Sequence, residues 1–325
     1  MNYYFNQRVF YILTSTFVFF LFFLISLPVY INLGIMRLIS IITGAVFILA
    51  CSQGTRHESF QAIYQPMDTI LVNERLSQFA IAQNTDMPDL MVEIAKSFMN
   101  FPYVAKTLEQ ESDEKLVVNL REFDCTTLIE SAMAIGYATI NEKPSFNTYL
   151  ETLQHIRYRQ GTNSGYTSRL HYFTDWITDN IEKGFIADVT LQYGGIEYPN
   201  KLNFMSTHTY AYEQLKNDSV LVEEMKILEK EISNRTYYYI PENKIAEIED
   251  KLKPGLIVAF TTYIEGLDVV HAGITYEQNG QIKLLHASTD EGAVVISDKT
   301  LSEYVKGNRL QTGIILLQAI FQTKH

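Results

Sequence analysis

Asn279-Gly280 lies between two β-rich runs, residues 268–276 and 281–287. This dipeptide between such runs is the strongest short-range signal for a β-hairpin, because both positions of the tight turn require positive φ. A two-residue turn also fixes the register of the two strands. In that register Gln278 faces Gln281, Ile274 faces Leu285, Gly273 faces His286 and His271 faces Ser288.

The hairpin register places two histidines on one face of the sheet. Paired residues point to the same side, as do residues two apart on one strand, so His271 and His286 are diagonal neighbours about 7–8 Å apart at the backbone. Gly273, opposite His286, is expected to leave open space above this face. The two histidines could form part of a metal site, a base with the residue that orients it, or a chance pair.

Other parts of the chain predict helices before the hairpin and more strands around it. Met87-Pro88-Asp89 opens one helix, another follows Asp124, and a charged helix covers roughly Ser219–Ser233. Helices first and a sheet later indicate an α+β fold rather than alternating βαβ units. The predicted strands are Leu256–Tyr263, Asp268–Tyr276, Gln281–Ala287, Ala293–Ser297 and Thr312–Gln318.

The charged residues are distributed unevenly. Residues 1–51 hold only Arg8 and Arg37, so all 37 acidic residues lie in the remainder, and the net charge is −11. Phosphate binding needs a basic face, so this acidic body argues against nucleic acid as a partner. Two cysteines exclude a disulfide scaffold and a Cys-rich zinc site. Because no repeat, low-complexity stretch or Pro/Gly linker divides the body, residues 52–325 are interpreted as one domain.

Two apolar runs fill the leader, residues 1–51. Val9–Ile31 is long enough to span a bilayer, which takes roughly 20 residues, whereas Leu38–Ala50 has the size of a signal-peptide core. The second run ends in Ala50-Cys51, which resembles a bacterial lipobox. Cys51 would then carry the lipid and become the mature N-terminus. The alternative is a buried cysteine at the end of a second membrane helix.

The first apolar run needs its own explanation. If it spanned the membrane with Arg8 inside, Arg37 would lie outside, against the positive-inside tendency. One hypothesis is that translation starts at Met36; the other is a real N-terminal transmembrane anchor. In either case we expect a bacterial cell-envelope protein that faces the periplasm, attached to the membrane by its lipid or by its leader.

The second cysteine, Cys125, begins a predicted helix. Asp124 is a good N-cap, and apolar residues recur at helical spacing after it. A thiol there meets unpaired backbone N–H groups and the positive end of the helix dipole, which can lower a cysteine pKa from about 8.5 to roughly 3.5–7.5. Free cysteine is also among the most buried residue types, so a structural role stays open.

Cys125 and the histidine pair together fit a nucleophile with its base. A thiolate–imidazole pair needs one cysteine at a helix start and two polar residues on facing strands. The sequence offers this set once, with His271 as the base and His286 as the residue that orients it. A zinc site would need a third ligand at characteristic spacing, and none is apparent. We therefore expect no metal and no other cofactor.

Four short segments resemble the NlpC family of papain-like cell-wall cysteine hydrolases. Those enzymes show a Pro-Tyr segment, a Tyr/Phe-Asp-Cys helix start, a His-x-Gly strand and a strand that ends in His-Ala-Ser. The likeness covers about residues 88–318. The segments are Asn100-Phe101-Pro102-Tyr103, Phe123-Asp124-Cys125, Val270-His271-Ala272-Gly273-Ile274 and Leu285-His286-Ala287-Ser288.

Within that family the sequence is most similar to the branch described as N-acetylmuramoyl-L-alanine amidase-like. Asn100 stands where the family usually has Gly, and Thr126-Thr127 replaces the common Ser-Gly after the nucleophile. The second departure is consistent with this branch rather than with the endopeptidases. The segments typical of the branch include Tyr158-Arg159, Ser168-Arg169-Leu170-His171-Tyr172, Asp175-Trp176-Ile177, Asn203-Phe204-Met205-Ser206 and Gly266-Leu267-Asp268.

The resemblance implies a papain-like fold in which the helix that carries the nucleophile packs on an antiparallel sheet, with a family-specific insertion around residues 146–250. It implies that Cys125 attacks an amide carbonyl, that His271 acts as general base and then acid, and that His286 orients His271. The candidate substrate-binding residues are Tyr103, Asp124, Arg169, His171 and Asp268. For Arg169 and His171, a buried hydrogen-bonded corner is the alternative.

The expected function is hydrolysis of the amide between N-acetylmuramic acid and L-alanine in peptidoglycan fragments, through a thioester. Residues 146–250 are expected to narrow the groove and favour small muropeptides, including anhydro forms in recycling, over polymeric wall. One alternative is a peptidase that cuts the stem peptide after D-glutamate with the same residues. Another is a muropeptide-binding lipoprotein without catalytic activity.

Overall fold

The computed structural model describes residues 62–80, 85–109 and 113–320. These residues belong to one compact unit. The lipobox at Cys51, the apolar runs and the alternative start at Met36 lie outside the described residues. Among the described residues, no helix combines the length and the apolar character that a membrane span requires.

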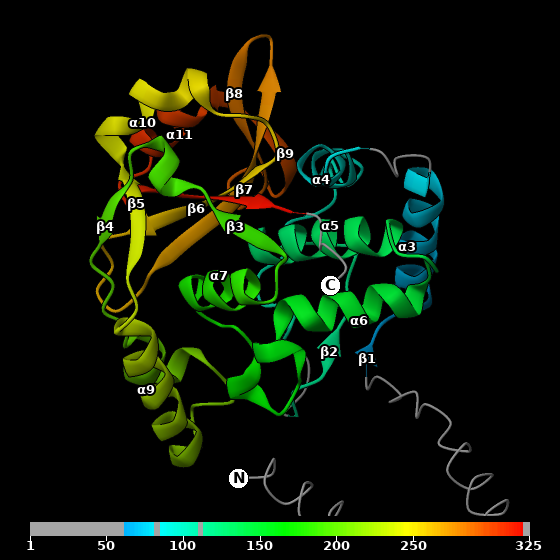
Figure 1. The fold of residues 1–325 in the computed structure, drawn as a ribbon. Coiled ribbons are helices and arrows are strands. Elements are labelled where there is room, and N and C mark those ends of the chain that lie inside the picture. The colour runs from blue at the N-terminus through cyan, green and yellow to red at the C-terminus, as the bar shows by residue number, and fades with distance from the viewer. Residues whose placement is uncertain (1–61, 81–84, 110–112, 321–325) are drawn as a thin grey trace, which may run out of the picture. The chain divides into compact units, whose positions relative to one another are not determined.

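The protein is a mixed α+β structure built on an antiparallel sheet with helices on both faces (Figure 1). The order of the sheet is β4-β5-β10-β6-β7-β8-β9, and β3 pairs with β10 beside this path. The helices are α3 Pro66–Phe79, α4 Met87–Lys96, α5 Cys125–Thr139, α6 Phe146–Arg157, α7 Phe173–Glu182, α8 Phe204–Thr207, α9 Ser219–Ser233, α10 Glu242–Ile248 and α11 Leu301–Gly307. The strands are β1 Ala62–Ile63, β2 Leu116–Val117, β3 Ile186–Asp188, β4 Ile196–Tyr198, β5 Tyr237–Pro241, β6 Leu256–Thr262, β7 Val269–Gln278, β8 Gln281–Ser288, β9 Ala293–Thr300 and β10 Gln311–Ala319.

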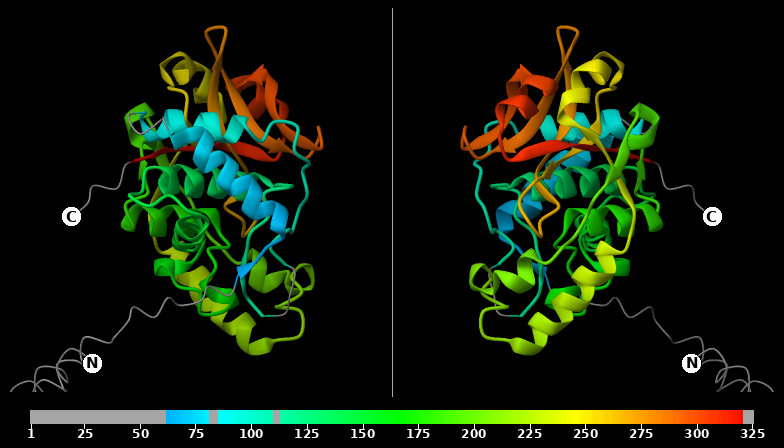
Figure 2. Two further views of the ribbon diagram at one scale, coloured as in Figure 1. Left: turned by 90° about the vertical axis from the view of Figure 1, so that its right-hand side faces the viewer. Right: turned by 90° about the vertical axis from the view of Figure 1, so that its left-hand side faces the viewer.

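The central strands are buried on both faces, because helices cover the sheet from two sides. In β6, Ile257 and Ala259 pack into one hydrophobic cluster with helices α3 to α7. The alternate residues Val258 and Phe260 pack into a second cluster with α10 and α11. This alternation follows from the period of two along a strand. The views in Figure 2 show the helices of the first cluster on one side of the sheet and α11 on the other.

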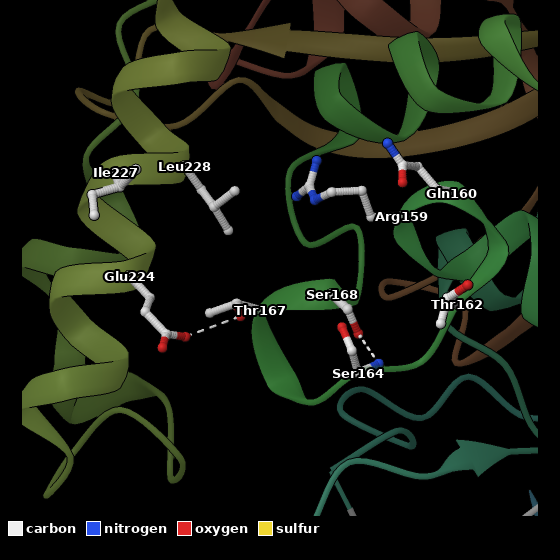
Figure 3. Close-up of a pocket in the computed structure, with 9 residues that line it drawn as sticks. All are labelled: Arg159, Gln160, Thr162, Ser164, Thr167, Ser168, Glu224, Ile227 and Leu228. Atoms are coloured by element: carbon white, nitrogen blue, oxygen red, sulfur yellow. Dashed lines mark hydrogen bonds between the residues drawn. The ribbon is translucent and has the colours of Figure 1, made fainter. Parts of the chain in front are cut away.

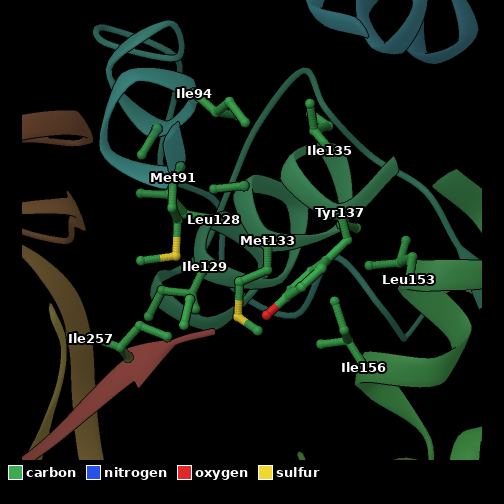
Figure 4. Packing of buried hydrophobic residues seen from close by; sticks show 14 of the residues in the cluster. Met91, Ile94, Leu128, Ile129, Met133, Ile135, Tyr137, Leu153, Ile156 and Ile257 are labelled. Atoms are coloured by element: carbon green, nitrogen blue, oxygen red, sulfur yellow. The ribbon is translucent and has the colours of Figure 1, made fainter. Parts of the chain in front are cut away.

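Helix α5 lies in the middle of the larger cluster. Leu128, Ile129, Met133 and Ile135 are each 0% exposed, and Figure 4 shows them among side chains from α4, α6 and the sheet. Fully burying an aliphatic side chain of this size contributes about 1.5–3 kcal/mol. This burial along the helix fixes the place of its first residue, Cys125.

The predicted hairpin is present. Asn279 (φ 55°) and Gly280 (φ 77°) both adopt the left-handed conformation that a two-residue type I′ turn requires. The pairs of Gln278 with Gln281 and of Ile274 with Leu285 are confirmed. The other three strands predicted from the sequence are present too, with ends that differ by up to three residues.

Residues 146–250 contribute to the sheet and to its core. Strand β5 pairs with β10 on one side and with β4 on the other. Leu153 and Ile156 of α6 and Trp176 of α7 are at most 1% exposed and belong to the cluster that surrounds α5. The segment predicted as an insertion therefore forms part of the body of the domain.

Candidate active site

Cys125 is the first residue of α5, as the sequence predicts. The Asp124 carboxylate accepts hydrogen bonds from the Thr127 backbone N–H (2.8 Å) and hydroxyl (2.9 Å), while the Asp124 N–H donates to the Thr127 hydroxyl (2.9 Å). This capping box holds the helix start in one conformation. Cys125 is half-buried as a residue, and its sulfur lies near the backbone of Thr126 in the first helical turn.

The thiol contacts the strand that carries the first histidine of the predicted pair. The hydrogen-bonded ladder of β7 and β8 runs from the turn to Ile274 and Leu285. Nearer the start of β7, the backbone of Ala272 lies close enough to the Cys125 sulfur to favour its thiolate form, and α5 packs against β7. Tyr304, whose ring packs on both histidines, also interacts with Cys125, so the start of α5 lies near the histidine pair.

The two histidines form a hydrogen bond with each other. His271 Nε2 and His286 Nδ1 are 2.8 Å apart, and the rings meet edge to face at 80°. When His271 carries its proton on Nε2, it donates to His286 and keeps Nδ1 free to accept a proton. This is the tautomer that a general base with an orienting partner requires. The predicted placement on one face is confirmed.

The space expected above Gly273 is filled, so this prediction is wrong. A Cβ at residue 273 would lie 2.6 Å from a side-chain carbon of Leu284 and 3.0 Å from Cβ of His286. The glycine therefore lets the two strands approach closely enough for the histidines to meet. It does not provide a binding space for substrate.

Tyr304 of α11 packs against both histidines, and the sequence analysis missed it. Its ring centroid is 5.2 Å from that of His286 and 6.2 Å from that of His271. Burial, with Asp290 and Cys125 nearby, raises the pKa of Tyr304 to about 12. Leu301 and Val305 are buried on the same helix, so the spacing of apolar residues could have indicated that residue 304 faces the sheet.

Two substitutions of Tyr304 test whether the packing of its ring on the histidines affects kcat. Tyr304→Phe keeps the ring and should leave kcat within about threefold. Tyr304→Ala removes an edge-to-face contact with His286 and a tilted contact with His271; aromatic pairs are worth about 0.5–1.5 kcal/mol each, so kcat should fall by roughly tenfold. The check is steady-state kinetics of amide hydrolysis with both variants. Equal losses in the two variants would instead assign the effect to the phenolic hydroxyl.

The side chains of Cys125, His271 and His286 are electrically neutral near pH 7. Burial, followed by the charge of Asp124, raises the pKa of Cys125 to about 11, although backbone hydrogen bonds act in the opposite direction. Burial and the neighbouring His286 lower the pKa of His271 to about 3, and burial lowers that of His286 to about 4. The expected lowering of the cysteine pKa at the helix start is therefore wrong for the free protein, since desolvation outweighs the helix end.

These shifts predict how stability depends on pH. In the unfolded chain a histidine binds its proton near pH 6.5, but the buried His286 does so only near pH 4. The unfolded state therefore holds more protons between these values, and the free energy of unfolding falls as the pH falls through that range. Urea unfolding measures the free energy of unfolding at pH 7 and at pH 4.5. Its decrease between the two pH values should be smaller in His286→Asn than in the wild type, by about 1 kcal/mol or more. An equal loss in both proteins would contradict the assignment to His286.

Tyr103 lies close to the proposed nucleophile. Its backbone N–H donates to the Gly292 carbonyl at 2.9 Å, which attaches this segment to the start of β9. Burial raises the pKa of its phenol, and Thr289, Cys125 and Asp124 all interact with it. The structure thus places Tyr103 where it could contact a group bound at Cys125.

Arg169 and His171 are held inside the protein. Arg169 lies 3.4 Å from a carboxylate oxygen of Glu109 and 3.3 Å from one of Glu114. His171 Nε2 is 2.8 Å from the Tyr166 carbonyl oxygen, and burial lowers the pKa of His171 well below its usual value. These contacts correspond to the buried corner that the sequence left open. A substrate role for either residue stays a prediction.

Asp268 and Asp124 also have partners within the chain. The buried Asp268 carboxylate accepts hydrogen bonds from the Thr174 N–H (2.7 Å), the Thr174 hydroxyl (2.8 Å) and the Val269 N–H (2.8 Å). It therefore ties the first turn of α7 to the start of β7. Asp124 caps α5, as described above. Both residues position the two elements that carry Cys125 and His271.

Two cavities lie beside the residues typical of the branch. One, of about 550 Å³, is lined by residues 159–168 and by α9, and Figure 3 shows its hydroxyl groups from Ser164, Thr167 and Ser168. The other, of about 660 Å³, is lined by the β6–β7 connection and residues 197–203. Neither is lined by Cys125. In the described parts of the chain, no group of three or more His, Cys, Asp or Glu residues could hold a metal ion.

Comparisons with known proteins agree with this architecture. The model of the AmiA-like family, N-acetylmuramoyl-L-alanine amidase-like, matches residues 93–314. The chain is similar to the crystal structure of an N-acetylmuramoyl-L-alanine amidase from Bacteroides uniformis ATCC 8492, with 37% identity and a TM-score of 0.69 over 72% of this chain and 99% of that one. No curated protein sequence matches the chain.

Two further solved structures are similar. A Bacteroides fragilis protein provisionally described as a xylanase has 39% identity and a TM-score of 0.66, over 70% of this chain and 99% of that one. A Legionella pneumophila protein has 18% identity and a TM-score of 0.56, over 77% of this chain and 94% of that one, and shows a shared fold.

Proposed function

The chain belongs to the N-acetylmuramoyl-L-alanine amidase-like family, and from this premise we propose that it cleaves the amide between N-acetylmuramic acid and L-alanine in peptidoglycan fragments. The observation that supports the proposal is the contact of Cys125, at the start of α5, with the strand of the His271–His286 pair. We also infer an NlpC-type papain-like fold, because a capped helix carries the nucleophile and packs on an antiparallel sheet.

The chemistry we propose starts from the neutral thiol. As the sulfur attacks the carbonyl carbon, its proton passes to His271, and His286 stabilises the imidazolium through their hydrogen bond. Backbone N–H groups at the start of α5 stabilise the oxyanion. His271 then protonates the leaving amine of L-alanine, which leaves the muramoyl group on sulfur as a thioester. Water activated by His271 hydrolyses the thioester and restores the thiol.

The family assignment supports Tyr103 as a contact for substrate, since it lies beside the thiol. Arg169 and His171 would act through the loop that they hold in place, and Asp124 and Asp268 through the elements that they join. Small muropeptides, including anhydro forms, remain the proposed substrates. We further propose that Cys51 carries a lipid and that the domain faces the periplasm. Intact-mass analysis of the native protein tests this point, because an N-terminus that contains Met1 would contradict it.

A defined muropeptide distinguishes the candidate reactions. Digestion in the presence of EDTA, followed by mass spectrometry, should give free stem peptide that begins with L-alanine. A muramoyl-L-Ala-D-Glu product, together with a fragment that begins with the diamino acid, would instead identify the stem-peptide endopeptidase. Xylan serves as a control, because glycosidases generally use a pair of carboxylates about 5–9.5 Å apart, whereas the proposed residues are a cysteine and two histidines. Binding without any product would support the non-catalytic alternative.

A further inference from the structure

The cavity of about 660 Å³ lies at the end of the sheet where β7 begins. Its walls are residues 262–267, which run from the end of β6 into the β6–β7 connection, and residues 197–203, which run from β4 towards α8. Gly266 adopts φ +79°, and a Cβ there would come within 2.0 Å of the Asn203 amide oxygen. The two walls are therefore packed tightly against each other, and the cavity is a built feature of the fold.

The cavity is attached to the strand that carries His271. The Asp268 carbonyl accepts hydrogen bonds from the Tyr198 hydroxyl (2.9 Å) and the Thr262 N–H (3.2 Å), and both donors belong to residues that line the cavity. His271 follows Asp268 by three residues on an extended strand, which corresponds to roughly 10 Å. A ligand in the cavity is thus within the reach of a short peptide from the proposed catalytic residues.

Three charged side chains of the cavity have no ion-pair partner among the described residues. These are the exposed Lys201, Glu197 and Glu265. The other cation there, Arg235, is paired at 2.7 Å with Asp175 and at 2.8 Å with Glu231. The cavity therefore presents one available cation and two available carboxylates.

The buried side-chain oxygen of Asn200 is a hydrogen-bond acceptor that no donor of the described residues reaches. Its Nδ2 donates to the Thr174 hydroxyl oxygen at 3.3 Å, and the proton of that hydroxyl is already donated to Asp268. This arrangement fixes the orientation of the Asn200 amide and leaves its oxygen without a hydrogen-bond partner among the described residues. Because a buried acceptor without a donor is costly, residue 200 favours a ligand that carries N–H or O–H groups.

The cavity of about 550 Å³ in Figure 3 differs from the larger one in how its charged side chains are paired. Its Arg159 forms a two-point ion pair with Asp175, at 3.0 and 2.7 Å, and its Glu224 accepts a hydrogen bond from Thr167. The charged groups of that cavity are engaged within the protein. Only the larger of the two cavities offers charges of both signs to a ligand.

We propose that the larger cavity binds the zwitterionic end of the diamino acid at the third position of the stem peptide. Lys201 would pair with its carboxylate, and Glu197 and Glu265 with its ammonium group. The proposal rests on the proposed function, which supplies the stem peptide. Three extended residues span about 10–11 Å, and the γ-linked D-glutamate and the side chain of the diamino acid add to this length, so the stem peptide is long enough to cover the separation of the cavity from His271 along the strand.

Calorimetric measurement of peptide binding tests the proposed ligand of the larger cavity without requiring catalytic turnover. The probes are two free tripeptides, L-Ala-γ-D-Glu-diaminopimelate and the same peptide with L-lysine in third place, which lacks the distal carboxylate. The full chain should bind the first about tenfold more tightly, and Lys201→Met should remove that preference. Lys244→Met is the matched control, since Lys244 is an exposed lysine of α10 paired with Glu247. It should keep the preference.

Two results would overturn the proposal: no preference in the wild type, or a preference that survives Lys201→Met. The outcome is independent of the proposed reaction, because the probes contain no scissile bond to muramic acid. If the preference depends on Lys201 while defined muropeptides stay uncleaved, the cavity is supported and the proposed function fails. If muropeptides are cleaved without any preference among tripeptides, the proposed function stands and the cavity proposal fails.

Discussion

Replacing Cys125 with alanine is expected to lower kcat/KM for muropeptide hydrolysis by about 10⁴-fold or more, because the sulfur that forms the proposed thioester is lost. The side chain is half-buried and the helix is capped by its neighbours, so the fold should persist. Product formation followed by mass spectrometry measures the loss, and circular dichroism with calorimetric muropeptide binding shows that the variant is folded and still binds.

Cys125→Ser is the conservative partner of this variant. It keeps the position of a donor at the helix start but replaces a soft nucleophile with a hydroxyl of much higher pKa. We expect muropeptide binding close to that of the wild type and turnover nearly as low as in the alanine variant. Turnover within tenfold of the wild type in either variant would contradict a cysteine mechanism.

The second large effect is expected at His286, which orients His271. His286→Leu removes the acceptor of the 2.8 Å hydrogen bond and leaves the His271 Nε2 proton buried without a partner, at a cost of about 1–3 kcal/mol. The tautomer with a free Nδ1 then loses its advantage, and kcat should fall by roughly 10²-fold or more. Steady-state kinetics with a defined muropeptide measures this loss.

His286→Asn is the matched variant, since its amide oxygen can accept the same proton. It should retain clearly more kcat than His286→Leu, with similar KM in both. Equal losses would mean that His286 acts by filling space rather than by accepting a hydrogen bond. His271→Ala should be more severe than either, because the proposed base itself is lost.

Local chemistry made the core of the site predictable. Asn279-Gly280 demands a two-residue turn, and the alternation along the two strands then places His271 and His286 on one face. Asp124 before an apolar helical pattern fixes Cys125 as the first residue of α5. Each inference needed only the conformational preferences of residues close together in sequence.

Features that depend on contacts between distant segments were not predictable. Tyr304 meets the histidines only because α11 folds back onto the sheet, and β5 joins β10 although they are far apart in the chain. The protonation of Cys125 depends on how much of the surrounding structure excludes water. The close approach at Gly273 likewise depends on how the side chain of Leu284 packs. Burial of this kind is a property of the assembled fold.

The most direct test is to search for the covalent intermediate. Protein mixed with a defined muropeptide and quenched within milliseconds to seconds should carry a mass increase equal to the muramoyl group, located by peptide mapping to the fragment that contains Cys125. A mass increase that also includes L-Ala-D-Glu would identify the endopeptidase instead. An unmodified Cys125 at every quench time during active turnover, with none formed in a variant slowed at His286, would contradict the thioester mechanism.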